Sequence, residues 1–289
     1  MRRAAGAWAM LACATLAGCL GPDGPRAFFR SAEASKHASY AVGGFGNAFG
    51  NSLAPDDLPG LSVESILYER PLGDALFDRD LWANAAAFLP PNTKTLLEEN
   101  GFRAVILGGN LPPAFLKLLE SKNEAIAPHR LSFVHRTEEV LPTLGPIVEC
   151  KYDLLGSLGG DREAVKLKDA NAGILIRPEL CGDGRVKLYC EPQVQHGERQ
   201  EFIRPNADAT GFQLQGEFPV ERYPRLGFEA TLAAGEFLVI GAPADATELL
   251  GSALFTVESK SEPRQRILVV RANYRKPEPA QAMNRPRTK

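Results

Sequence analysis

Residues 173–191 alternate between apolar and polar positions on either side of a short glycine-rich centre. The Gly-Asp-Gly cluster at residues 182–184 supplies the positive-φ positions that a tight hairpin needs. With that cluster as the loop, one apolar face contains three cross-strand pairs: Leu180 with Val186, Pro178 with Leu188, and Ile176 with Cys190. The opposite face is expected to meet water and to carry Lys187, Tyr189 and Glu191. Because proline cannot donate to a ladder, Pro178 places its strand at a sheet edge or at a bulge.

A second pair of apolar segments flanks a three-residue connection that ends in Gly235. Such a connection is typical of a hairpin with a type I turn followed by a bulge. The two strands of this hairpin are expected to share one apolar face, made by Phe228, Ala230, Leu232, Leu238 and Ile240. Residues 266–271 are apolar at consecutive positions, which predicts a central strand covered on both faces. Together with the first hairpin, these segments predict an antiparallel sheet.

The segment before this sheet mixes strand-like and helix-like spacings of apolar residues. Strands are predicted at residues 61–69 and 102–107. Helices are predicted at three places: residues 80–89, a segment capped by Asn92 and ended by Gly101, and a segment opened by Pro112 that runs over residues 113–121. The core of this region is expected to contain its large apolar side chains, namely Trp82, Phe88, Leu96, Phe102 and Phe115.

The predicted fold class is therefore α+β. A small α/β module over residues 60–128 is followed by a mainly antiparallel β domain over residues 129–274. Two further strands, at residues 131–135 and 147–151, are expected to join the β domain.

The first residues of the chain have the arrangement of a secretory signal. A basic start is followed by an apolar stretch over residues 4–16, which is too short for a transmembrane helix. Leu16-Ala17-Gly18-Cys19 then matches the bacterial lipobox, in which the chain is cut between Gly18 and Cys19 and lipid is attached to Cys19. The alternative is an ordinary secretory signal in which Cys19 is incidental. We expect residues 1–18 to be the signal. The residue after Cys19 is Leu20 and not Asp, and in this the chain resembles lipoproteins that are sent to the outer membrane.

Composition and charge add little to this picture. The formal net charge is −2, and it becomes −4 once Arg2 and Arg3 are removed, which argues against nucleic acid as a partner. Residues 19–59 are rich in Gly, Ala, Ser, Asn and Pro and are predicted to be a flexible spacer. Residues 275–289 carry five basic residues and one Glu. They are predicted to be a disordered basic tail, with weak contact to anionic lipid or wall polymer as the alternative.

Candidate chemistry is sparse. A Gly-x-Ser-x-Gly elbow is missing from the sequence, and the four His residues are scattered at 37, 129, 135 and 196. The best candidate is residues 196–201, where His196, Glu198 and Glu201 are close enough to share an ion. A solvated polar loop explains them more simply, because the sequence indicates no further ligand outside this segment to complete a metal site. We therefore assign no catalytic, cofactor-binding or metal residue and expect no enzyme. The alternative is an envelope hydrolase or ligand-binding enzyme that uses the loop around His196.

Several short segments have a shared order: the strand into Pro178, the Asp183-Gly184 hairpin, residues 235–241 (Gly-Glu-Phe-Leu-Val-Ile-Gly), residues 250–255 (Leu-Gly-Ser-Ala-Leu-Phe) and a closing strand at 267–270. This order resembles the end of the bacterial secretin domain of type II and type III secretion systems. The chain departs from that family at Gly241-Ala242-Pro243, where Gly-Gly-Leu is usual, and it lacks the gate-forming hairpins. The mature chain also resembles uncharacterised bacterial envelope lipoproteins. These resemblances imply a place in the envelope and no activity.

The function predicted from these features is that of a lipid-anchored structural or interaction module of an envelope assembly, on the periplasmic side of the outer membrane. Its expected partners are the membrane, through lipid on Cys19, and other proteins or further copies, through the β domain. Between the two hairpins, only residues 211–218 are predicted to form a strand, short and without a mate. Such a strand cannot cross a bilayer, so we expect no pore.

Three further thiols would lie in an oxidising compartment: Cys150, Cys181 and Cys190. In the register described above, Cys181 and Cys190 are too far apart to form a disulfide. Cys190 is expected to be buried, with Cys150 as its only candidate partner.

Overall fold

A computed structural model describes the chain over residues 60–85, 87–109, 111–121, 124–133, 138–155, 161–205, 211–259 and 261–275. The predicted signal peptide, the lipid attachment site Cys19, the spacer and the tail beyond Arg275 lie outside these residues. Within them, strands dominate and every ladder between named strands is antiparallel. The predicted α+β class with a mainly antiparallel sheet is confirmed.

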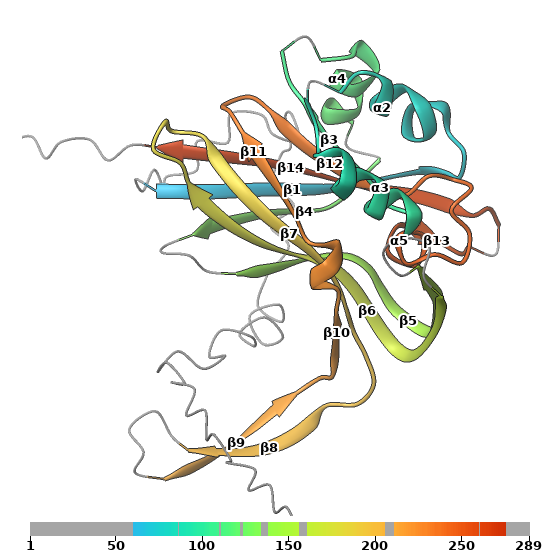
Figure 1. Ribbon diagram of the computed structural model, residues 1–289, viewed down its shortest axis with the longest axis vertical. Coiled ribbons are helices and arrows are strands. Elements are labelled where there is room, and N and C mark those ends of the chain that lie inside the picture. Colours follow the sequence, from blue (N-terminus) through green and yellow to red (C-terminus); the bar gives the residue numbers. More distant parts are fainter. Residues whose placement is uncertain are drawn as a thin grey trace, which may run out of the picture.

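The larger sheet has seven strands (Figure 1). Its order is β2 (Ala87–Phe88), β3 (Arg103–Leu107), β12 (Phe237–Gly241), β14 (Arg264–Arg275), β1 (Gly60–Pro71) and β4 (Ala125–Phe133), with the short β13 (Thr256–Val257) paired to β14. β14 lies between β1 and β12, so the prediction of a central strand near residues 266–271 is confirmed. The sheet takes strands from both sides of residue 128, while the division into two domains at that residue stays a prediction.

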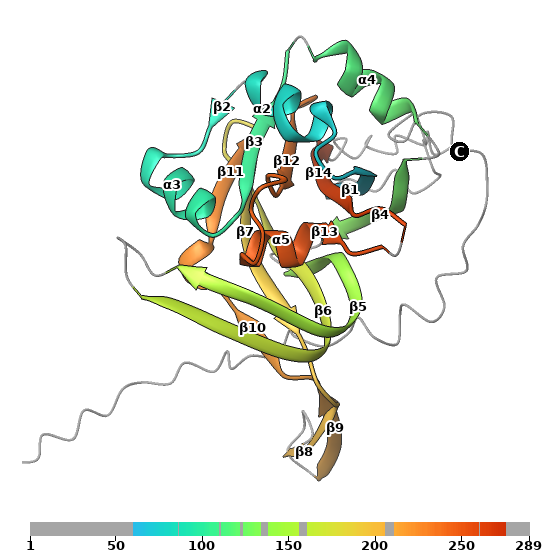
Figure 2. The same cartoon turned by 90° about the vertical axis from the view of Figure 1, so that its right-hand side faces the viewer.

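The smaller sheet has five strands. Its order is β10 (Val220–Arg222), β7 (Val186–Gln195), β6 (Arg162–Leu180) and β5 (Glu139–Leu155), with β11 (Phe228–Leu232) also on β7. β5 and β6 form a long curved hairpin that is plain in Figure 2. A third, two-stranded sheet stands apart from both.

Helices are short; several lie on the larger sheet, whereas α5 packs mainly on β5 and η3 on β7 of the smaller one (Figure 2). They are the π-helical turn η2 (Leu76–Asp80), α2 (Leu81–Ala83), α3 (Pro91–Glu99), α4 (Pro113–Glu120), the 3-10 turn η3 (Pro224–Leu226) and α5 (Leu250–Phe255). Side chains of η2, α2 and α4, among them Phe77, Leu81 and Phe115, pack on one face of the larger sheet against Tyr68 and Val239.

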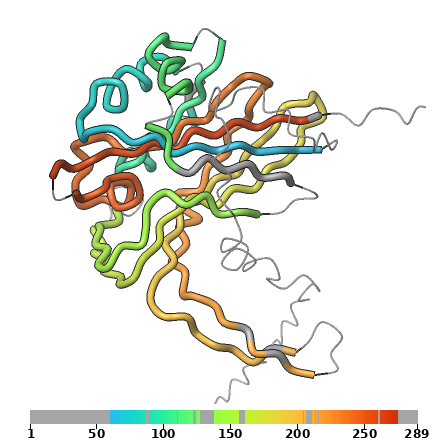
Figure 3. The backbone as a smooth tube through the Cα atoms, turned by 180° about the vertical axis from the view of Figure 1, so that it is seen from behind, coloured from blue at the N-terminus to red at the C-terminus, as the bar shows by residue number. Residues whose placement is uncertain are grey.

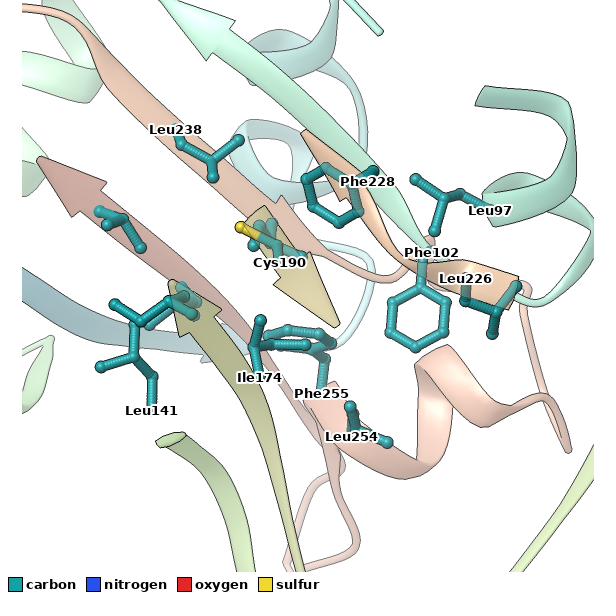
Figure 4. Packing of buried hydrophobic residues seen from close by; sticks show 14 of the residues in the cluster. Leu97, Phe102, Leu141, Ile174, Cys190, Leu226, Phe228, Leu238, Leu254 and Phe255 are labelled. Carbon is teal, nitrogen blue, oxygen red and sulfur yellow. The ribbon is translucent and has the colours of Figure 1, made fainter. Parts of the chain in front are cut away.

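The main core lies between the two sheets (Figure 4). The larger sheet contributes Leu238 and the smaller one Ile174 and Cys190, all fully buried. Phe102 and Phe255 meet edge to face with ring centroids 6.3 Å apart at the end where α5 packs on β5. Apolar side chains that alternate along each strand thus form a sandwich core, and consecutive apolar residues of β14 serve both faces of the larger sheet.

The first predicted hairpin is confirmed in its register. β6 and β7 pair Leu180 with Val186, Pro178 with Leu188 and Ile176 with Cys190. Within the described residues the β5–β6 ladder runs to Ile176, so Pro178 lies past its last described pair.

The second predicted hairpin is wrong. The turn before Glu236 does form, with Gly235 at φ +83° and Glu236 N donating to Ala233 O at 3.1 Å. β11, however, pairs with β7 of the smaller sheet, and β12 pairs with β3 and β14 of the larger one. The chain crosses between layers here, because β11 and β12 can both turn their apolar faces into the shared core without pairing with each other.

Two local predictions in the first part are also wrong. Residues 80–89 do not form one helix: α2 ends at Ala83, and β2 begins at Ala87 and pairs with β3. Asn92 is not a cap, since α3 begins at Pro91 after Pro90 without a side-chain cap. Pairing at the sheet edge and the fixed φ of proline outweigh local helix propensity. Gly101 does end α3 in the left-handed region, at φ +78°.

The predicted core of this part is partly confirmed. Phe102 and Phe115 are buried, whereas Trp82 and Leu96 are half-buried and Trp82 donates Nε1–H to Phe77 O at 2.6 Å. The side chain of Phe88 lies outside the described part. The strands predicted at residues 61–69 and 147–151 lie within β1 and β5, and the strand predicted at 102–107 is present as β3, one residue shorter at its start. β4 begins earlier than predicted and pairs with β1.

Candidate interaction site

A two-stranded ribbon projects from the smaller sheet, away from the body of the molecule (Figures 1 and 3). It consists of β8 (Gln200–Pro205) and β9 (Phe212–Glu217), which pair from Gln200 with Glu217 to Pro205 with Phe212. We call the described residues 196–205 and 211–219 the arm. The prediction of a single strand without a mate at residues 211–218 is therefore wrong. The apolar residues of β8, Phe202 and Ile203, are adjacent, so β8 lacks the alternation by which a strand is recognised in a sequence.

The arm has one apolar face. Directly opposed residues of an antiparallel pair point to the same side, so Ile203 and Leu214 share a face with the next pair, Pro205 and Phe212. Their side chains are open to solvent: Ile203 is 73% exposed, Leu214 64% and Phe212 76%. Phe202 lies on the other face and is 42% exposed. These four are half of the large apolar side chains found exposed in the described residues.

This arrangement is unusual for a ribbon that stands alone. A two-stranded hairpin is marginally stable in water and normally needs a third strand or a packed face. No other described strand pairs with β8 or β9, so both outer edges of the arm keep unpaired backbone groups. The arm thus combines an uncovered apolar face with two open edges, the features by which strands recognise other chains.

The root of the arm is held rigidly on the smaller sheet. His196 N donates to Pro219 O at 2.9 Å and closes the ribbon at its base. Gly197, at φ +68°, donates its N–H to Lys168 O on β6 at 2.8 Å. Beyond the root, β10 pairs with the end of β7, from Val220 with Gln195 to Arg222 with Gln193.

A buried ion pair fastens β10 to β7. The Glu191 carboxylate is only 2% exposed and receives Arg222 Nε on Oε1 at 2.8 Å and Nη2 on Oε2 at 3.1 Å. Tyr189 OH donates to the same Oε2 at 3.0 Å. The hydrogen bond to Glu191 raises the pKa of Arg222. The prediction that Glu191 faces water is therefore wrong: the charged side of β7 provides the lock at the base of the arm.

A tyrosine pair supports the same root from the core side. The hydroxyls of Tyr152 on β5 and Tyr223, which follows β10, share a short hydrogen bond, and their rings meet edge to face at 6.1 Å. Burial raises the pKa of Tyr223 to about 12. Burial, with the hydrogen bond to Tyr223, raises the pKa of Tyr152 as well.

These tyrosines predict a loss of stability at alkaline pH. An unfolded tyrosine titrates near pH 10, so above that pH the folded state holds more protons than the unfolded one, and stability falls as pH rises. The contribution is fully present below about pH 10 and fades toward about pH 12, by up to roughly 1.4 kcal/mol per pH unit and group. Urea unfolding across this window should show a shallower decline for Tyr152→Phe. The control Tyr274→Phe, at the end of β14, should keep the wild-type slope, and equal slopes in all three proteins would contradict this assignment.

The segment around His196 does not converge into a reactive site. His196 Nε2 lies 3.6 Å from Glu221 Oε1 across the root. Glu198 and Glu201 are exposed on the arm beyond it. Among the described residues, no three His, Cys, Asp or Glu side chains are grouped closely enough to hold a metal ion.

A cavity of about 320 Å³ lies between α2, α3 and β3, lined by Asp78, Trp82, Lys94, Glu98 and Arg103 among others. Its charged groups already face one another: Arg103 Nη1 lies 3.8 Å from Asp78 Oδ1, and Lys94 Nζ 3.8 Å from Glu98 Oε1. Arg103 also donates to Asp78 O at 2.6 Å. These contacts bind the cavity wall together and single out no nucleophile or general base.

The three described thiols are free. Cys150 and Cys190 are buried, and burial raises the pKa of both, which makes them poor nucleophiles. The predicted burial of Cys190 and its separation from Cys181 are confirmed; the suggested partnership with Cys150 is not formed.

Within the described residues, no helix has the length and apolar character needed to cross a membrane. No protein-family model, curated protein or solved structure matches this chain. The arm was missed by sequence reasoning. The signal that could have revealed it is the alternation at residues 212–217 together with a second short segment at 200–205 that contains Phe202 and Ile203, separated by residues 206–211 (Asn-Ala-Asp-Ala-Thr-Gly).

Proposed function

We propose that this chain is a lipid-anchored, non-catalytic interaction module of the bacterial envelope, with the arm as its binding element. The observation that carries the proposal is the uncovered apolar face of Ile203, Phe212 and Leu214 on a ribbon whose root is hydrogen-bonded to the smaller sheet. Leu16-Ala17-Gly18-Cys19 supplies the anchor. The protein would face the periplasm from the outer membrane, as part of an envelope assembly.

Binding by the arm follows from burial. Covering an exposed Leu, Ile or Phe side chain contributes about 1.5–3 kcal/mol. Less of this gain is lost to ordering the arm when the arm is already held in its binding conformation. The Glu191–Arg222 pair and the hydrogen bonds at His196 and Gly197 hold the arm in place before it binds. The sandwich body then acts as a scaffold, and its charged cavity walls and buried thiols need no chemical role.

The anchor is tested by changing Cys19. Several acyl chains on one cysteine give near-permanent membrane attachment, since each buried methylene adds about 0.8 kcal/mol. We expect mass spectrometry of the membrane fraction to show a lipid-mass increment on the peptide that starts at Cys19. Cys19→Ser, exported with a cleavable secretory signal, should move almost all of the folded protein into the soluble fraction.

The matched control is Cys181→Ser, which makes the same substitution at a free, partly exposed cysteine of the folded body. It should stay with the membrane and keep the lipid increment. A wild-type chain with an unmodified terminus at Cys19, or a Cys19→Ser variant that still needs detergent, would refute the anchor.

A further inference from the structure

The exposed apolar face of the arm requires a binding partner, and the charge of the arm indicates the chemistry of that partner. The arm contains three acidic residues (Glu198, Glu201, Glu217) and two arginines (Arg199, Arg204), and the sequence between its strands adds Asp208. Segments that lie on membrane surfaces combine an apolar face with an excess of Lys and Arg. An acidic ribbon is repelled by anionic lipid, so a protein surface with basic groups fits the arm better.

A second observation is an open strand edge on the same molecule. β5 is the terminal strand of the smaller sheet and pairs along its length only with β6. On its other side, the described residues give a single bridge near its end, between Asp153 and Leu249. Residues 147–152 run free of proline for six residues, the length of β8 and of β9. A long unpaired edge of this kind is a template for an added strand.

The side chains around this edge complement the arm. Val148 on β5 is 81% exposed, more than any other large apolar side chain in the described residues. Lys151 Nζ and Lys166 Nζ lie 3.1 Å and 2.5 Å from the same carboxylate, that of Glu149, so two cations share one anion. Lys168 is exposed at the cross-strand position of Glu149. The edge thus carries an exposed apolar side chain on one face, and on its other face Lys151, Lys166 and Lys168 outnumber Glu149, whereas the arm is apolar and acidic.

We infer that the arm of one copy binds the β5 edge of a second copy of this chain, adding β8 or β9 to the smaller sheet of its neighbour; this rests on the proposed function and names its partner. Within one copy the arm points away from the body and leaves its own apolar face open (Figure 3).

The geometry of this contact is head to tail. The arm and the β5 edge are different surfaces, so every copy gives one arm and receives another. Such contacts close into a ring when the rotation permits and otherwise continue as a filament. The outcome is an assembly of this chain on the membrane, in which each apolar arm face is covered by the next copy.

Photo-crosslinking in native membranes identifies the occupant. Full-length chain with Phe212→p-benzoylphenylalanine is produced together with a differently tagged wild-type copy, and the membranes are irradiated. We expect a product that carries both tags and maps to residues 147–152 of the second copy. A product with lipid, with another protein alone, or within one chain alone would overturn the inference, as would the absence of any product.

A binding measurement on the purified lipidated chain in mild detergent gives the second readout. Phe212→Ser with Leu214→Ser should weaken self-association at least about tenfold. The control Leu116→Ser, which changes an exposed apolar side chain on α4, should stay within about twofold of wild type. Equal weakening by the control, or none by the arm variant, contradicts the inference.

Charge exchange between the two surfaces provides the most specific test of the contact. Glu198→Lys with Glu201→Lys, or Lys166→Glu with Lys168→Glu, should each weaken self-association about tenfold, and the combination should restore it to within about threefold. Failure of the combination to recover would overturn the contact. If the arm captured another protein instead, the contact between copies would be refuted, while the proposed interaction module would still hold. An unlipidated Cys19 would refute the anchored module whatever the arm binds.

Discussion

Gly251→Ala is expected to destabilise the protein by about 3 kcal/mol, the upper part of the range for overpacking a closed interior. Gly251 lies in α5, where its N–H donates to Asn100 O at 2.9 Å. A Cβ at this position would overlap the carbonyl group of Gly101 and lie 2.9 Å from Phe102 N. Backbone atoms cannot move aside as a flexible side chain can, so α5 must shift away from the backbone of Gly101 and Phe102, just before β3, and from the core contact between Phe102 and Phe255.

Thermal unfolding followed by circular dichroism measures this effect, with roughly 2–4 °C of melting temperature per kcal/mol for a body of this size. In an open helix Gly→Ala would instead stabilise by up to about 1 kcal/mol, so the sign of the change alone is informative. The control is Gly182→Ala in the exposed turn between β6 and β7, where no atom lies within 4 Å of the added Cβ. We expect it to stay within about 0.5 kcal/mol of wild type. A neutral or stabilising Gly251→Ala would mean that α5 does not sit against the backbone of Gly101.

Arg222→Ala is expected to cost about 2–3 kcal/mol, since it leaves the nearly inaccessible Glu191 carboxylate without its cation. This loss of stability lies at or below the lower end of the range for breaking a buried ion pair, because Arg222 itself is 35% exposed and Tyr189 still donates to the carboxylate. The loss falls at the root of the arm, because Arg222 belongs to β10, which directly follows the arm and pairs with β7. Hydrogen exchange should therefore rise first at residues 193–195 and 220–222.

A compensating variant separates lost charge from lost packing. Glu191→Gln in the Arg222→Ala background removes the unpaired charge at nearly constant shape, so urea denaturation should show at least half of the lost stability restored. The control Arg185→Ala breaks the pair with Asp183, in which both side chains are at least half exposed, and should change stability by less than about 1 kcal/mol. If Arg222→Ala and Arg185→Ala had the same effect, the Glu191–Arg222 pair would not lock the arm.

Local chemistry was sufficient for some elements. The register of β6 and β7 follows from the Gly182-Asp-Gly184 turn and the alternation on both sides of it, because a slip by one residue would move every apolar side chain to the wrong face. The same holds for the double-sided burial of β14 and for Gly101, whose left-handed conformation ends α3. The lipid anchor at Cys19 likewise rests on contiguous residues and stays a prediction.

Other features were decided only by contacts between distant residues. The turn at Gly235 is compatible with a hairpin and with a crossing between layers, and the choice depends on β7 and β14, which offer better partners to β11 and β12 than these offer to each other. The burial of Glu191 depends on Arg222, 31 positions later in the chain, because the cost of desolvating a carboxylate is met only once its cation arrives. The arm needed both β8 and β9: each strand alone is a short, mixed segment, and an apolar face appears only when the pairing of Ile203 with Leu214 and of Pro205 with Phe212 brings their side chains to one side. Sequence therefore determined the elements whose information lies within a turn and its flanks, whereas the tertiary structure decided which strands pair and which surface stays uncovered, since those depend on free-energy differences between alternative partners that no single segment contains.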